Sequence, residues 1–424
     1  MLRNRGLVLS VVGALYGLSA MGDQMALVAL TIRLHDQGRS GLAISALVIA
    51  GVLPLVVVGP LAAPLVDRVE SGRLIVVVTA LQAVIALGLA FVTDVVASIG
   101  LLALLGVGPA VVSPALLLLV PEILGEENAA RGYARLETFR SAGNVVGPAL
   151  AGLLVAAFDD RVALLCDAAT FAAMAVAFLG LRVRRRPVAG TSGNWLVQVR
   201  EGVGVLGADR LLRTAIAALF AAILFTAVLS VARVFFIRDD LGASDTAYGV
   251  LVTAHTVGML LTSALIAPRI PVAWQPRVLA GAGVLMGAAL AASAGIPVFA
   301  VALGAFVLTG AANSLQALAI RNLIHARVPA DVRGRAFASS GAALNGANLT
   351  GTAFGGPAVS LLGGAGALAL AGIGTLVVSL AGAPMLLRGR REAGRTPADA
   401  GRTPADAGRT STTGTARPVG PARD

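Results

Sequence analysis

The chain has 424 residues, of which 57% are hydrophobic and only 13% are charged. Soluble domains carry about 25% charged residues, so this composition excludes a water-soluble globular protein. The net charge of +11 comes from arginine alone, because the chain contains no lysine. Its distribution along the chain argues against nucleic-acid binding. The single cysteine, Cys166, and three widely separated histidines leave no internal disulfide and no residue set for a metal ion.

Apolar runs of membrane-spanning length recur along the chain. The first run, from Gly6 to Ile32, is too long for the core of a cleaved signal peptide, so we interpret it as the first span. The runs between charged or Pro/Gly-marked breaks predict an all-α polytopic membrane protein with twelve transmembrane helices in two six-helix halves. The predicted spans are 7–32, 42–65, 74–93, 97–119, 136–157, 162–181, 211–236, 246–267, 277–295, 297–319, 336–362 and 364–387.

The arginines provide an independent test of this layout. With the N-terminus inside, 28 of the 33 arginines fall in loops or tails on the cytoplasmic side. This asymmetry is the positive-inside pattern of membrane proteins. We therefore expect a multi-pass protein of the cell membrane with both termini in the cytoplasm.

The spans group into four parts of the chain. We expect an N-terminal six-helix half over 1–182 and a cytoplasmic linker over 183–210, within which 195–208 forms a short interfacial helix. A C-terminal six-helix half follows over 211–387. The remaining 388–424 repeat "AGRTPAD", are basic and lack apolar anchors, so a disordered tail is expected there.

The two halves repeat one device. A Val-Pro precedes a Gly-Pro by 27 residues in the first half (Pro121 to Pro148) and by 28 in the second (Pro329 to Pro357). Small residues allow close helix packing, and a proline inside a helix bends it. Ordinary small-residue packing is the alternative to a role in transport. The glycines and prolines concerned are Gly143, Gly147, Pro148, Gly152, Gly356 and Pro357.

Several stretches carry a resemblance to a known family. "GPLAAPLVDRVESGR" lies between predicted spans 2 and 3, "SPALLLLVPEIL" and "GPALAG" in spans 4 and 5, and "VPADVRGRAFA" before span 11. Together with "GDQMALVAL" and "CDAATF", they are similar to the major facilitator superfamily over all twelve spans. Within it, the chain resembles the efflux branch that includes macrolide and siderophore exporters. The resemblance implies alternating access between two six-helix halves.

The same resemblance implies a cytoplasmic gating loop. Its charged members here are Asp67, Arg68 and Arg73. A generic loop turn is the alternative, and the loop departs from the family pattern at Ala63 and at "VES". The arginine that other drug–proton antiporters carry in span 4 is absent from this chain.

Asp23 is the only formal charge in the first apolar run. A carboxylate at mid-membrane costs about 2.5–3.5 kcal/mol on insertion scales. Tyr16, Ser19 and Asp23 share one helical face through their i, i+3 and i+7 spacing. A carboxyl group that is alternately dry and wet takes up and releases a proton, so we predict a proton-coupling role. The alternative is a packing carboxylate paired with an arginine or a helix terminus.

Asp167 is a second candidate for proton coupling, with a water-accessible helix cap as the alternative. Gln82, Asn144 and Gln316 are polar groups at depth and are candidates for lining a substrate cavity. Arg233 is expected at the outer end of span 7, where its side chain can snorkel to the surface.

These observations predict proton-coupled efflux of a lipophilic small molecule, neutral or weakly charged, such as a drug or natural product. Such an activity is associated with antibiotic resistance. The proton gradient would be the energy source, with no cofactor, no metal and a monomeric protein. An uptake symporter on the same fold is one alternative, and a non-transporting polytopic membrane protein is another. No catalytic residue set is evident in the spans, so we do not expect an enzyme.

Overall fold

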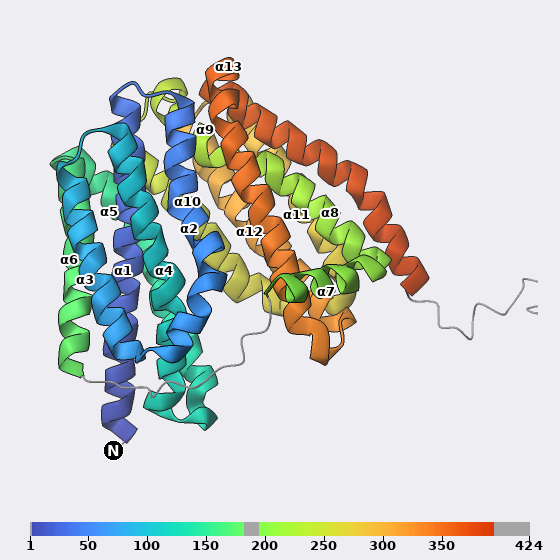
Figure 1. Ribbon diagram of the computed structural model, residues 1–424. Helices are drawn as coiled ribbons and strands as arrows, with labels where there is room; N and C mark the ends of the chain where they lie inside the picture. Colours follow the sequence, from blue (N-terminus) through green and yellow to red (C-terminus); the bar gives the residue numbers. More distant parts are fainter. Residues whose placement is uncertain (1, 182–194, 394–424) are drawn as a thin grey trace, which may run out of the picture.

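The structure is a computed structural model that describes residues 2–181 and 195–393, and these residues form helices joined by short connections (Figure 1). The longer helices are α1 (Leu2–Asp36), α2 (Gly41–Arg68), α3 (Ser71–Phe91), α4 (Val95–Leu124), α5 (Ala129–Ala157), α6 (Asp160–Leu181), α7 (Trp195–Ala208), α8 (Arg210–Thr226), α9 (Leu229–Phe235), α10 (Asp245–Leu261), α11 (Gln275–Gly295), α12 (Phe299–Arg327) and α13 (Ala330–Ala393). Short helical turns are η1 (Glu126–Asn128), η2 (Phe236–Asp240), η3 (Thr262–Ile266), η4 (Ala267–Arg269) and η5 (Val272–Trp274).

The predicted all-helical membrane fold is confirmed. Within the described residues, 11 helical stretches are long and apolar enough to cross a membrane. The last of these runs from Val332 to Leu387 and is interrupted at Gly363, where φ is +71° and ψ is −176°. Figure 1 shows α13 climbing to one end of the bundle and then descending beside α8. The reversal at Gly363 matches the predicted break between spans 11 and 12, so the described residues form twelve candidate spans.

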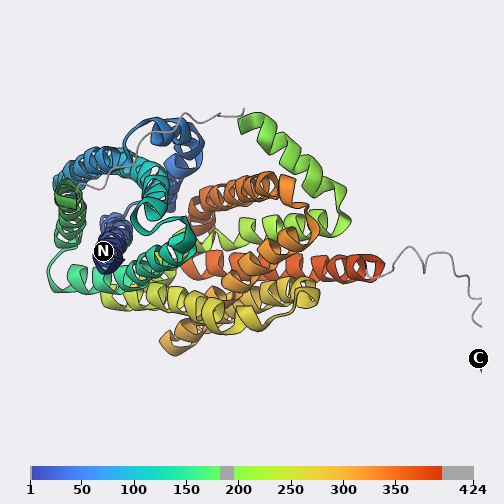
Figure 2. The ribbon, with the colours of Figure 1, turned by 90° about the horizontal axis from the view of Figure 1, so that it is seen from below.

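The helices gather in two groups, which Figure 2 shows side by side from below. In the first group α1 packs on α5 and α6, α3 on α4 and α6, and α2 on α4. In the second, α13 packs on α8, α9 and α11, and α12 packs on α10 and α11. The predicted boundary near 182–183 lies outside the described residues. Helix α13 continues to Ala393, so only the first residues of the predicted tail are described.

The last part of the predicted linker belongs with the second group. α7 forms over the segment predicted to be a short helix, and it packs against α13 and α8. Asp209 then caps α8 by accepting from the Leu212 N–H at 3.0 Å, and it pairs with Arg327 at 2.6 Å. Burial raises the pKa of Asp209, but these two partners outweigh it and hold the pKa below its usual range.

Glycines let α5 approach two neighbours closely. A Cβ on Gly143 would clash with the Gly17 carbonyl of α1, and a Cβ on Gly147 would lie 2.7 Å from the Met21 carbonyl oxygen. One turn further on, a Cβ on Gly152 would lie 2.5 Å from the Asp245 carbonyl oxygen of α10. The predicted glycines of α5 therefore hold it against α1 within its own half and against α10 of the other half.

The second copy of the device joins α13 to α2. A Cβ on Gly356 would lie 2.8 Å from the Gly41 carbonyl oxygen, and a Cβ on Gly41 would lie 2.9 Å from the Gly356 carbonyl oxygen. Pro357 follows inside the same helix, as Pro148 does in α5. Both close approaches between the halves lie toward the end of the bundle where α1 finishes at Asp36, which we call the Asp36 end.

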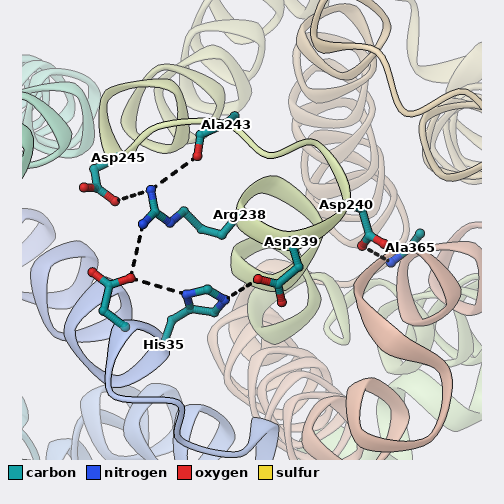
Figure 3. Close-up of polar contacts among 8 residues, drawn as sticks. His35, Arg238, Asp239, Asp240, Ala243, Asp245 and Ala365 are labelled. Atoms are coloured by element: carbon teal, nitrogen blue, oxygen red, sulfur yellow. Dashed lines mark hydrogen bonds and ion pairs between the residues drawn. The ribbon is translucent and has the colours of Figure 1, made fainter.

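Charged residues also join the halves at the Asp36 end (Figure 3). Arg238 of η2 lies 3.2 Å from Asp36 of α1 and 2.9 Å from Asp245 of α10. His35 Nε2 lies 3.0 Å from Asp239 Oδ1. We call these five residues the Asp36 cluster. The neighbouring Asp240 accepts the Ala365 N–H at 2.7 Å and fixes the start of the descending part of α13.

Replacing Gly363 by alanine is expected to destabilise the protein. Its backbone lies in a region that only glycine occupies readily, and an L-residue there costs about 1–3 kcal/mol. Nothing lies within 4 Å of a Cβ at this position, so the effect is conformational rather than steric. The midpoint of thermal unfolding in detergent should therefore fall.

Gly346 is the matched control on the same helix. A Cβ there also meets nothing within 4 Å, but the residue is helical. Gly346→Ala should leave the midpoint unchanged or raise it, since alanine is more favourable than glycine inside a helix. If both variants behaved alike, the reversal of α13 would not depend on the glycine at position 363.

Replacing Arg238 by glutamine is expected to loosen the contact between the halves. The change leaves Asp36 and Asp245 facing each other without a cation, and two partly exposed ion pairs are together worth roughly 1 kcal/mol. A cysteine placed at Val359, which is buried near Gly41, reports on this contact in a Cys166→Ser background. Its maleimide labelling should accelerate roughly fivefold. Arg39→Gln, at an exposed position in the α1–α2 connection, should leave the labelling rate unchanged.

Candidate functional site

Two cavities lie at the middle of the helices, one in each half. The first, which we call the N-cavity, has a volume of about 400 Å³ and is bordered by α1–α5 and α10. The second, the C-cavity, has a volume of about 350 Å³ and is bordered by α8–α13. Helix α10 borders both: Thr256 and Met259 line the N-cavity, whereas Val252 and His255 line the C-cavity.

The polar face predicted for α1 lines the N-cavity. Tyr16, Ser19 and Asp23 all border it, and the Tyr16 hydroxyl lies 3.0 Å from the Ser113 hydroxyl of α4. Because α1 packs between α5 and α6, with α4 also in contact, one face of its central turns is left for the cavity. The predicted spacing therefore places Asp23 toward a void and not toward lipid.

Asp23 also borders a smaller cavity of about 170 Å³, which we call the side cavity. The side cavity lies among α1, α2, α4 and α6, and Asp167 lines it as well. Within the part of the chain that the structure describes, Asp23 has no ion-pair partner. The carboxyl group thus lies between two voids, and the alternative of a carboxylate paired with an arginine does not hold.

Asp167 lies against the backbone of α1. Asp167 is 0% exposed, and a Cβ on Gly22 of α1 would clash with the Asp167 carboxyl oxygen. Neither of its carboxyl oxygens has a hydrogen-bond partner among the described residues. The alternative of a water-accessible cap is wrong, because Asp167 lies two turns inside α6. The cap of this helix is Asp159, which accepts a hydrogen bond from the Val162 N–H in the first turn.

The predicted cavity residues separate into two groups. Gln82 of α3 and Asn144 of α5 line the N-cavity with Asp23, whereas Gln316 of α12 lines the C-cavity. Gln82 reaches across α4 through the gap left by Gly108 and donates to the Leu105 carbonyl at 3.3 Å. The structure therefore brings two of the three amides to the carboxylate and places the third in the other half.

Arg68 and Arg73 of the gating loop line neither the N-cavity nor the C-cavity. Arg68 ends α2 and is exposed, and Arg73 is exposed in the first turn of α3, 3.7 Å from Glu70. The side chain of Asp67 is outside the described part of the structure. A gating role for Asp67, Arg68 and Arg73 stays a prediction.

Two arginines line the cavities, a position that was not predicted for them from the sequence. Arg140 lines the N-cavity while its guanidinium bonds to Glu137 at 2.6 and 2.9 Å. It lies one helical turn before Asn144, a spacing that could have identified it. Arg233 lies near the outer end of its span as expected, but it lines the C-cavity and does not snorkel to the surface. It is the single charge in the stretch 214–237 of the sequence.

The remaining polar groups at depth fit ordinary packing. His255 Nδ1 lies 3.2 Å from the Thr309 hydroxyl of α12, an interhelical contact. Arg33, buried at the Asp36 end, pairs with Asp160 and donates to the carbonyls of Leu89 and Val92 at 3.1 Å each. Over residues 2–181 and 195–393, no group of three His, Cys, Asp or Glu side chains is arranged to hold a metal ion.

Comparison with known proteins identifies the fold and the family. The model of the Major Facilitator Superfamily matches residues 12–232 and 214–417. The chain is 25% identical over 357 residues to YfiS of Bacillus subtilis (strain 168), an uncharacterized MFS-type transporter, covering 82% of this chain and 85% of YfiS.

Solved structures give the same answer at the level of the fold. The nucleoside transporter NupG aligns with a TM-score of 0.72 at 13% identity, covering 92% of this chain and 100% of NupG. A bacterial homologue of the human lysosomal transporter Spinster, in an inward-facing and unoccupied conformation, aligns with a TM-score of 0.70 at 16% identity, covering 93% and 99%. The chain belongs to the Major Facilitator Superfamily, and it is a multi-pass membrane transport protein, not an enzyme.

Proposed function

We propose that this transporter exports a lipophilic small molecule across the cell membrane in exchange for protons, with Asp23 and Asp167 as the proton-coupling residues. The observation that carries the proposal is the position of Asp23 between the N-cavity and the side cavity, without a cationic partner among the described residues. No cofactor takes part, and the proton gradient supplies the energy.

The physical basis is the cost of charge in a dry environment. A carboxylate excluded from water and from any cation is costly, so the group holds a proton when its cavity is closed and releases it when water enters. Asp23 and Asp167 line the same side cavity, and two carboxylates that share a site do not both ionise readily. At least one of the two carboxyl groups therefore holds a proton while the side cavity is closed.

Export is proposed from the efflux-branch motifs, and the arrangement of the halves is a state that export requires. The arginine asymmetry assigns the N-terminus to the cytoplasm, so the Asp36 end faces outward. The Asp36 cluster and the two glycine contacts join the halves at that end. An exporter accepts its cargo from the cytoplasm in such a state. The similarity of the efflux-branch motifs in predicted spans 4, 5 and 11 supports the same direction.

Proton coupling is tested by replacing Asp23 with asparagine. The amide keeps the size of the side chain but cannot carry a proton, so uptake into everted vesicles driven by a proton gradient should fall at least roughly tenfold. Radiolabelled erythromycin and the dye Hoechst 33342 serve as lipophilic probes. Asp23→Glu, which keeps the carboxyl group, should retain part of the activity.

Asp94 provides the matched control. It is an exposed cap of α4 that accepts the Ala97 N–H at 2.8 Å, and asparagine caps a helix as well as aspartate does. Asp94→Asn should transport at the wild-type rate. Unchanged proton-driven uptake in Asp23→Asn would refute the coupling role, and accumulation confined to right-side-out vesicles would replace export by uptake.

A further inference from the structure

Arg233 of α9 is a partly buried arginine that borders the C-cavity, and it has no counter-ion among the described residues. Its guanidinium carbon lies 5.9 Å from the centre of the Tyr248 ring, and its Nε is buried without a hydrogen-bond partner in the described residues. No carboxylate of the described chain lies within ion-pair distance of it. An arginine inside a membrane protein normally pairs with an acid or marks a binding site.

Three other arginines in or near the spanning helices are paired. Arg33 pairs with Asp160, Arg140 with Glu137, and Arg238 with Asp36 and Asp245. Each of these pairs neutralises the cation within the protein. The cost of desolvating Arg233 is left without such compensation, which indicates that a ligand supplies the missing charge.

The surroundings of Arg233 favour an anion. In the described residues that line the C-cavity there is no aspartate or glutamate, and Arg233 and His255 are its titratable members. Four amide side chains add hydrogen-bond donors to the same wall. They are Asn313, Gln316, Asn345 and Asn348.

The rest of the C-cavity is mainly apolar, with three hydroxyl side chains from Thr226, Ser230 and Thr309. Aliphatic, thioether and aromatic side chains line it together with the amides, so a bound molecule meets both kinds of surface. A bare inorganic anion would leave the apolar wall uncovered. The larger apolar members are Leu219, Ile223, Leu229, Val252, Met286, Phe306 and Leu344.

We infer that the C-cavity binds the acidic group of an amphipathic organic acid, with Arg233 pairing with its carboxylate and the apolar wall covering its hydrocarbon part. A guanidinium and a carboxylate match in two parallel hydrogen bonds. The inference rests on the proposed function only in taking the C-cavity as part of the cargo route, and it narrows a weakly charged lipophilic cargo to a carboxylic acid.

Binding to the purified full chain in detergent tests the inference. The probes are 4-phenylbutyrate and 1-naphthylacetate, each compared with its uncharged amide, and the readout is the shift of the thermal unfolding midpoint with probe concentration. At least one acid should protect the wild type more strongly than its amide. In Arg233→Gln the apparent Kd of that acid should rise roughly tenfold to hundredfold, as expected for loss of a charged hydrogen-bonding partner.

Two further variants separate binding from folding. Arg233→Lys keeps the charge but loses the planar fork, so the acid should bind with intermediate affinity. Arg277→Gln, at an exposed position over Trp274, should leave both the midpoint and the Kd unchanged. If Arg233→Gln lowered the midpoint without probe but kept the wild-type shift, Arg233 would be structural and the inference would be wrong.

The result is independent of proton coupling, because no gradient is applied. Asp94→Asn, at the exposed cap of α4 outside both cavities, should bind the acid as the wild type does. If neither acid protected the wild type more than its amide, the inference would fail while the exporter proposal stood. If Arg233-dependent binding were found but transport ignored the proton gradient, the exporter proposal would fail and the anion site would remain.

Discussion

A charged side chain inside a membrane protein is stable only where an opposite charge or a wet cavity offsets the cost of leaving water. This constraint separates the charges of this chain into two groups. Arg33 and Arg238 are paired, and they fasten helices together at the Asp36 end. Asp23 and Arg233 border cavities and have no counter-ion among the described residues. The first group maintains the fold, and the second group is where transport chemistry is to be sought.

Close backbone contacts between glycines join the two halves that hold these cavities. Gly152 meets Gly249, and Gly41 meets Gly356, so the two halves touch with little side-chain volume between them. Such contacts permit a rocking movement, because small smooth faces reorient without unpacking large side chains. Since α10 borders both cavities, a movement about its contact with α5 would alter the N-cavity and the C-cavity together.

The twelve-helix fold was predictable because span length, arginine asymmetry and the break at Gly363 are local signals. The sequence also allowed prediction of Asp23, Gln82 and Asn144, since a polar residue within an apolar helix is easily recognised in a single sequence. The partnership of Asp167 with Asp23 was not, because it depends on how α6 lies against Gly22 of α1. The inward orientation of Arg233 was not predictable for a similar reason: the register of α9 and η2 at the Asp36 end determines that Arg238 pairs there and that Arg233 turns inward.

The two unpaired charges lie in different halves, and this limits how they can influence each other. A proton on Asp23 and a carboxylate bound to Arg233 would not be in contact. Neither ligand would therefore displace the other directly. Any exchange between them must then act through the relative position of the halves, each ligand favouring one arrangement by its own binding energy. On that basis the interfaces between α5 and α10 and between α2 and α13 are where coupling strength is set. A change at Gly152 or Gly356 would then alter the exchange ratio without touching either binding site.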